Sequence, residues 1–115
     1  MVFLGGGLGS ACRYAVSLGV LRLDSSQFPW ATLISNVAAC LVMAGFLLVM
    51  KTWGLASDAW RLLVMVGFCG GFSTFSTFSL ENHTLLRQGA YGFLATNVLI
   101  SVFLCLLVFI WLLRE

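Results

Sequence analysis

Residues 70–79 read Gly-Gly-Phe-Ser-Thr-Phe-Ser-Thr-Phe-Ser, and they lie inside an uncharged run that extends from Leu62 to Leu80. Paired glycines weaken a helix, and hydroxyl groups can satisfy the backbone groups that a break releases. We therefore predict a helix that is interrupted within this stretch. Irregular backbone at membrane depth is tolerated only where it is buried in protein or lines a water-filled cavity. The stretch is thus the first candidate for a functional site.

The rest of the chain has the composition of a membrane protein. Of its 115 residues, 61% are hydrophobic and 9% are charged, whereas a soluble domain carries about 25% charged residues. A helix needs roughly 20 mostly apolar residues to cross the hydrocarbon core of a bilayer. We predict an all-α membrane protein with one domain, residues 1–115, and four transmembrane helices at about 2–21, 29–50, 62–80 and 90–113.

Other architectures fit these runs poorly. A transmembrane barrel shows strands of about 10 residues that alternate in polarity, and a soluble helix bundle needs polar outer faces that the four segments lack. We expect the first segment to be a span rather than a signal peptide, because it lacks a basic start and Arg13 lies inside it. The cysteines lie one per span without a CxxC pair, and we interpret them as small apolar packing residues.

The segments that join the spans are short, so consecutive helices should run antiparallel and both termini should lie on one side of the membrane. We place Glu81 and His83 in the last loop, residues 81–89. Lysine and arginine normally mark the cytoplasmic side. Here Lys51, Arg61 and Arg114 lie on one side, against Arg22 and Arg87 on the other. This weak bias suggests that the chain inserts in both directions and that two copies pair head to tail.

Polar residues inside the predicted spans are further candidates. Arg13 either faces an aqueous vestibule that attracts anions, or snorkels to the interface or braces a loop. Asn36, four residues after Thr32, needs a hydrogen-bonding partner or a polar path. In the last span Asn97, Ser101 and Cys105 recur every four residues. They form one stripe, which serves either as a polar track or as a contact between helices.

These features together resemble the Fluc (CrcB-type) fluoride channels of microbial membranes, over essentially the whole chain. Three stretches carry the resemblance: the glycine-rich start that ends in Arg13-Tyr14, the Thr-Leu-Ile-Ser-Asn segment at 32–36, and residues 67–78, Gly-Phe-Cys-Gly-Gly-Phe-Ser-Thr-Phe-Ser-Thr-Phe. The chain departs from the usual family pattern at five positions, namely Ser10, Ser35, Ala39, Ser73 and Asn97.

The resemblance implies a role for particular residues. Phe75 and Phe78 are similar to the paired phenylalanines that contact fluoride, and Asn36 to the pore asparagine of the family. Thr77 matches a pore hydroxyl position. Further expected pore residues are Ser76, Asn97 and Ser101. The family also binds a central structural sodium ion (Na+) at the dimer interface, which implies that the carbonyls of Gly70 and Ser73 hold it, with Arg13 beside the vestibule.

The expected function is passive export of fluoride through an antiparallel, dual-topology homodimer in the cell membrane of a prokaryote, surrounded by lipid. A phenyl ring has a positive edge that can meet an anion, and hydroxyl and amide protons can replace lost water. No residue set suggests an enzyme, a nucleic-acid partner or a nucleotide-driven pump. The alternatives are a small multidrug-type transporter, which needs a carboxylate within a span, and a non-transporting membrane assembly protein.

Overall fold

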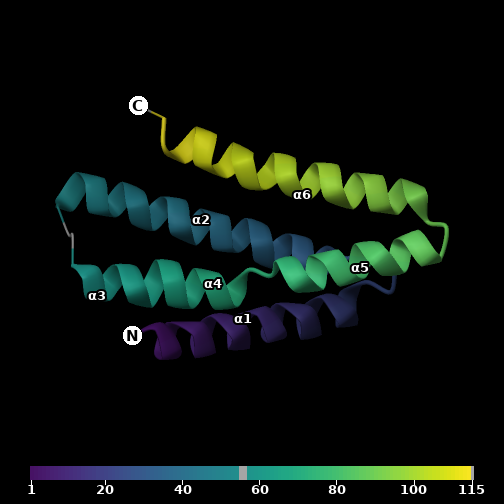
Figure 1. The fold of residues 1–115 in the computed structure, drawn as a ribbon, viewed down its shortest axis with the longest axis horizontal. Coiled ribbons are helices and arrows are strands. Elements are labelled where there is room, and N and C mark those ends of the chain that lie inside the picture. The colour runs from purple at the N-terminus through teal and green to yellow at the C-terminus, as the bar shows by residue number, and fades with distance from the viewer. Residues whose placement is uncertain (55–56, 115) are drawn as a thin grey trace.

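The protein is helical throughout the part that the computed structural model describes, residues 1–54 and 57–114, and these residues include no strand. Short loops separate four long helical segments (Figure 1). The elements are α1 (Val2–Leu23), α2 (Trp30–Trp53), α3 (Asp58–Arg61), η1 (Leu62–Cys69), α4 (Gly70–Phe72), α5 (Phe75–Arg87) and α6 (Tyr91–Leu112). α3, η1 and α4 follow one another without a gap, and η1 is a stretch of π-helix.

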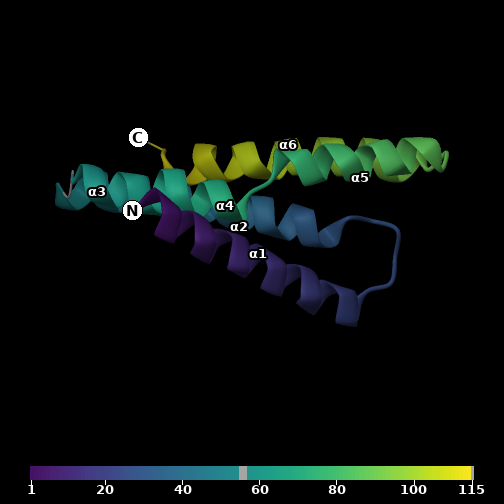
Figure 2. The same ribbon diagram turned by 60° about the horizontal axis from the view of Figure 1, so that its bottom comes forward.

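The long segments run antiparallel to their neighbours in the chain, as the short loops predict. The start of α1 and the end of α6 lie at the same end of the molecule as the end of α2 and the start of α3 (Figure 1). α1 diverges from the others and packs mainly against η1 and α4 (Figure 2). α2 and α6 form the second large contact. The longest dimension is 49 Å, enough to extend through a hydrocarbon core of about 30 Å.

Among the described residues, three helical segments are long and apolar enough to cross a membrane: Trp30–Trp53, Asp58–Arg87 and Tyr91–Leu112. The remaining predicted span corresponds to α1, which has 22 residues but is made less apolar by its glycines and by Arg13. Its assignment as a transmembrane helix stays a prediction. The apolar residues that cover the helix surfaces agree with a lipid-facing protein.

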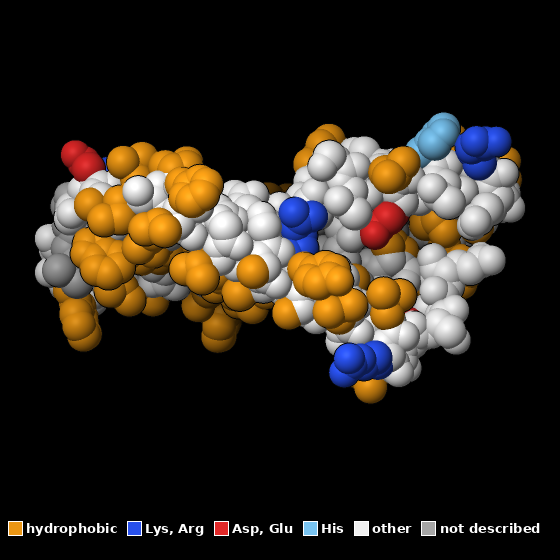
Figure 3. Space-filling model, turned by 90° about the horizontal axis from the view of Figure 1, so that it is seen from below, with side chains coloured by type: hydrophobic (Ala, Val, Ile, Leu, Met, Phe, Trp, Pro, Cys, Tyr) orange, Lys and Arg blue, Asp and Glu red, His pale blue; other side chains and the backbone are white. Residues whose placement is uncertain are grey.

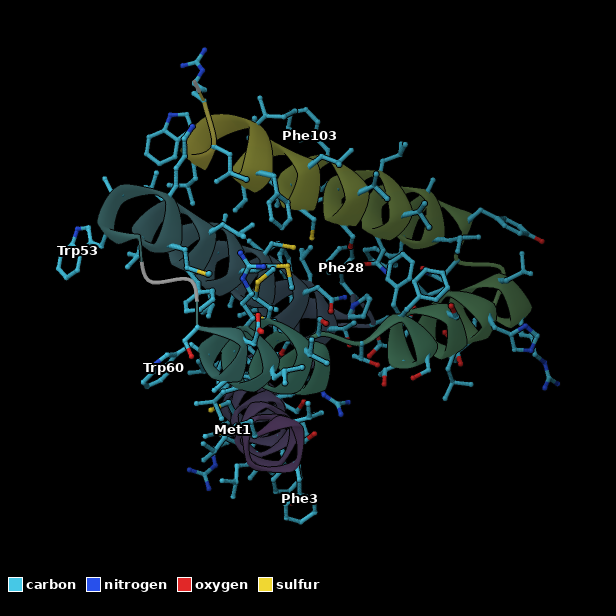
Figure 4. The ribbon with its side chains drawn as sticks, turned by 60° about the vertical axis from the view of Figure 1, so that its left-hand side comes forward. Met1, Phe3, Phe28, Trp53, Trp60 and Phe103 are labelled. Atoms are coloured by element: carbon cyan, nitrogen blue, oxygen red, sulfur yellow. The ribbon has the colours of Figure 1, made fainter. Side chains whose placement is uncertain are left out.

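The surface carries large apolar side chains on every long helix. Phe3 is 89% exposed, Trp53 75% and Phe103 64%, and all three point outward in Figure 4. Figure 3 shows apolar side chains along the length of the molecule and only scattered charged groups. The buried positions, by contrast, include small polar residues: Thr32, Ser35, Asn82, Asn97 and Ser101. This reversal of the usual distribution indicates that lipid surrounds the protein.

The predicted helix break is confirmed, and it lies at Ser73 and Thr74. Both residues have extended backbone, with ψ of 158° and 119° respectively. Gly70 and Gly71 belong to α4 and are helical, so they do not make the break themselves. Thr74 instead caps α5, because its side chain accepts a hydrogen bond from the Thr77 N–H, a role in which threonine stabilises a helix start.

The glycines serve close helix packing. A Cβ atom at Gly5 would lie 2.1 Å from the Leu63 carbonyl oxygen, and one at Gly71 would lie 2.4 Å from the Gly6 carbonyl oxygen. Gly9 is equally tight against Phe68. Gly5 and Gly9 therefore serve the contact between α1 and η1, since only a glycine lets the two backbones approach so closely.

The prediction of a loop over residues 81–89 was wrong. α5 continues to Arg87, and Gly89, with φ of 70°, ends it. Glu81 and His83 therefore lie on a helix. Charged residues marked the expected end of the apolar run, but α5 is capped at its start and buries Asn82 and Leu85 on one face. Because these residues give α5 a buried face, the helix continues beyond the uncharged run that ends at Leu80.

Candidate functional site

Asn36 of α2 faces the helix break and holds it open. Its Oδ1 accepts a hydrogen bond of 2.7 Å from the Thr74 N–H, and its Nδ2 donates one of 3.3 Å to the Thr74 carbonyl. One side chain thus satisfies both backbone groups of the same extended residue. Unpaired backbone groups are costly in a membrane interior. This pair of bonds explains why the chain can leave the helix at this point.

The break also diverts the donors of two carbonyls. In a regular helix the Thr74 N–H would donate to the Gly70 carbonyl, and the Thr77 N–H to the Ser73 carbonyl. Here the first donates to Asn36 Oδ1 and the second to Thr74 Oγ1 at 3.2 Å. Gly70 and Ser73 therefore lose their usual helical donors. These are the same two residues whose carbonyls the family resemblance assigned to sodium.

A cavity of about 270 Å³ lies beside the break. It is lined by Asn36, Cys40, Ser73, Thr74, Phe75, Phe78, Ser101, Val102 and Cys105. Four of the expected pore residues, Asn36, Phe75, Phe78 and Ser101, therefore meet at one place. They come from α2, α5 and α6, which are separated in the sequence, so the fold itself brings these residues together.

The two phenylalanines of the cavity are neighbours. The ring centroids of Phe75 and Phe78 are 5.8 Å apart, and their planes are inclined by 37°. Phe75 is 79% exposed, whereas Phe78 is half-buried. An anion prefers the positive edge of an aromatic ring to its negative face. Two tilted rings in one cavity can offer such edges together.

Ser76 and Thr77 surround the cap residue rather than lining the cavity. Thr74 Oγ1 donates to Thr77 Oγ1 at 3.1 Å and lies 3.2 Å from Ser76 Oγ. Thr77 accepts that bond, so its own hydroxyl proton is available to a further acceptor. Ser76 is exposed and Thr77 is half-buried. Both lie one helical turn or less from the break, on the first turn of α5.

Asn97 and Ser101 of α6 form a buried hydrogen-bonded chain with Asn82 of α5. Asn97 Nδ2 donates to Asn82 Oδ1 at 2.9 Å, and Ser101 Oγ donates to Asn97 Oδ1 at 3.3 Å. Asn97 is only 1% exposed and is not among the residues that line the cavity. Asn97 therefore makes a contact between helices, while Ser101 and Cys105 of the same stripe line the cavity. The Ser101 hydroxyl proton is directed toward Asn97.

Arg13 contacts the helix just before the break. Its Nε donates to the Gly71 carbonyl at 3.2 Å, and Ser10 Oγ is 3.5 Å from the same oxygen. This contact supports the bracing interpretation of Arg13. Arg13 is half-buried, and its contact with Gly71 places a positive charge two residues before Ser73 on the broken helix. The position of Arg13 beside a vestibule stays a prediction.

Sequence reasoning missed three polar residues of this region. Thr74 caps α5 and pairs with Asn36, Asn82 pairs with Asn97, and Glu81 Oε1 accepts a hydrogen bond of 2.7 Å from Thr32 Oγ1. Asn82 could have been found, because it lies four residues after Phe78 and so shares its helix face. The contact of Glu81 with α2 was missed because Glu81 was expected to lie in a loop.

The fold and the site define a class: a multi-pass α-helical membrane protein with a broken helix beside a small cavity. Its family follows from comparison with known proteins. The family model described as "CrcB-like protein, Camphor Resistance (CrcB)" matches residues 1–112. The chain belongs to the CrcB family.

Curated relatives named "Fluoride-specific ion channel FluC" align with almost the whole chain. The relative from Phocaeicola vulgatus is 38% identical, with 93% of this chain and 88% of the relative aligned. That from Coxiella burnetii (strain CbuK_Q154) is 41% identical, with 92% and 86% aligned. That from Pyrococcus horikoshii is 43% identical, with 96% and 91% aligned.

Proposed function

We propose that this chain forms a fluoride-specific ion channel that exports fluoride passively and so gives its host resistance to the ion. Relatives with that name align with this chain over nearly their full length. The structural observation that supports it is the cavity at the helix break, where Asn36, Phe75 and Phe78 meet. A broken helix that lines a cavity is a common way to build an ion site in a membrane.

The lining chemistry suits a small, strongly hydrated anion. Asn36 uses one of its two amide protons on Thr74, which leaves the second for an ion in the cavity. The ring edges of Phe75 and Phe78 add weak attraction. Each contact is modest, and an ion must be able to leave a channel as well as enter it.

We propose that a structural sodium ion binds at the same break, held by the carbonyls of Gly70 and Ser73. Hard cations prefer oxygen ligands, and unwound backbone carbonyls coordinate sodium in other membrane proteins. The diverted Thr74 and Thr77 N–H groups leave these two oxygens without helical donors, which fits the assignment. When bound, the ion would neutralise the carbonyl dipoles and stabilise the break.

We further propose that two copies assemble as an antiparallel homodimer of dual topology in the cell membrane of a prokaryote. The near-balance of basic residues on the two sides supports insertion in both directions. The 79% exposure of Phe75 also supports a second copy, because an ion path facing lipid would leave its polar groups unsatisfied. Labelling of a cysteine introduced at Ser26 should reach half of the copies from each side.

Coupled transport is the alternative to electrodiffusion, and the Glu81–Thr32 contact is the feature that would suit it. A coupled transporter of the small multidrug type needs a carboxylate within a membrane helix, and Glu81 lies on α5, within the apolar segment Asp58–Arg87. The two mechanisms differ in their electrical requirements. In proteoliposomes, fluoride efflux through a channel should start only when valinomycin lets potassium carry the compensating charge. Efflux that proceeds at the same rate without valinomycin, driven by a proton gradient, would favour the coupled transporter.

A further inference from the structure

Two thiols that the fluoride path does not require meet inside the cavity. Cys40 of α2 and Cys105 of α6 are half-buried and free, and they lie close enough for their side chains to interact, on two helices that pack against each other. Both line the cavity together with Phe75 and Phe78. Sulfur atoms, drawn in yellow, gather in the middle of the molecule in Figure 4. The sequence interpretation of these cysteines as packing residues does not explain a thiol pair that faces the cavity.

The surroundings of the pair restrict what it can bind. Among the described residues, no group of three histidine, cysteine, aspartate or glutamate side chains is placed to hold a metal ion. Zinc, which takes four such ligands in structural sites, is therefore a poor fit. Soft monovalent cations of the Cu⁺ and Ag⁺ type prefer thiolate ligands, and two thiolates suffice for them.

We propose that Cys40 and Cys105 form a two-thiolate site for a soft monovalent cation, which obstructs the cavity when it binds. Two metal–sulfur bonds form, and each thiol loses its proton to solvent. One cation of charge +1 between two thiolates leaves a net charge of −1. The bound site therefore repels an incoming anion as well as narrowing its path. Because protons are released, binding tightens as the pH rises.

The blocking part of this inference rests on the proposed function, whereas the binding part does not. Binding is measured on the full-length protein in detergent, with Cu⁺ kept reduced by ascorbate and buffered by the chromogenic chelator bicinchoninate. The wild-type chain should remove one Cu⁺ per chain from the chelator. Cys40→Ser and Cys105→Ser should each lose this uptake, while Cys12→Ser, at an exposed position, should retain it. Size-exclusion profiles confirm that each variant is folded.

Obstruction is measured as fluoride efflux from proteoliposomes, each variant being compared with its own rate without copper. Cu⁺ should slow the wild-type protein by roughly tenfold or more, since a charge of the same sign a few ångströms away repels strongly in a medium of low dielectric constant. Cys40→Ser should be insensitive. Single-cysteine variants that take up Cu⁺ as well as the wild type would overturn the site, and wild-type uptake without slowing would overturn the obstruction. A wild-type protein that binds Cu⁺ but conducts no fluoride would instead contradict the proposed function.

Discussion

Replacing Asn36 by leucine should close the helix break. The variant removes both hydrogen bonds to Thr74. An interhelical hydrogen bond in a membrane protein contributes about 0.6 kcal/mol on average and up to about 1.7 kcal/mol, so the loss is about 1–3 kcal/mol. The freed Thr74 N–H can return to the Gly70 carbonyl and extend the helix. A shift of about 1–3 kcal/mol changes the ratio of the broken to the continuous helix by roughly fivefold to a hundredfold or more.

The assay combines fluoride efflux with thermal unfolding in detergent, with and without sodium. Asn36→Leu should slow efflux, by at most the factor by which that ratio falls, and sodium should no longer raise its melting temperature. Ser35→Ala is the matched control on the same helix, because Ser35 Oγ is buried without a hydrogen-bond partner among the described residues. It should leave the melting temperature unchanged or raise it. Wild-type efflux and sodium response in Asn36→Leu would refute the reasoning that Asn36 maintains the break.

Four further changes test other parts of the molecule. Phe78→Ile should slow fluoride efflux without preventing dimer formation, and an unaltered rate would remove the ring from the pore. Gly5→Ala should lower the melting temperature, because the added Cβ would meet a backbone carbonyl of η1 at 2.1 Å; Gly7→Ala, which meets nothing within 4 Å, should be neutral or stabilising. Asn82→Leu should cost about 0.6–1.7 kcal/mol of stability by removing the bond to α6, as denaturant titration can check. The Asp24 carboxylate accepts hydrogen bonds from the Ser26 hydroxyl and N–H, which lower its pKa below the ordinary 3.8. The stability that the ionised carboxylate adds should be present above pH 3.8 and be lost only as the pH falls through the lowered pKa. An NMR titration that finds a pKa of 3.8 or above would disprove this.

The main features of the fold could be predicted because they depend on local chemistry. Long uncharged runs predict membrane helices, and the hydroxyl-rich stretch predicts the break. The role of the glycines was harder to predict from the sequence. Gly70 and Gly71 suggested the break itself, but Gly71 is needed for the approach of α1. Which partner a glycine faces is decided by packing between distant segments, and no local pattern reports it.

A charged residue does not reliably indicate where a helix ends. Glu81 marked the expected end of the third span and Arg87 lay in the expected loop, yet both belong to α5. A helix continues as long as its polar groups find partners, and Glu81 finds Thr32 across the interface with α2. The end came instead at Gly89, whose positive φ suits glycine.

Residues of the candidate site that lie in one motif were predicted, whereas pairs from separate helices were not. Phe75 and Phe78 were expected there from the family resemblance that their motif carries. The Asn82–Asn97 pair and the Cys40–Cys105 pair depend on how α6 is placed against α5 and α2. Asn97 was expected on the ion path because it shares a stripe with Ser101. The structure turns its amide toward Asn82 instead, which only a three-dimensional arrangement could reveal.

The central claim is that the break at Ser73 and Thr74 forms part of a path for fluoride. The most direct test is anion efflux from proteoliposomes that hold the purified wild-type protein and are loaded with either fluoride or chloride, in the presence of valinomycin. The account predicts rapid discharge of fluoride and retention of chloride. Retention of both anions, or discharge of both at the same rate, would contradict it.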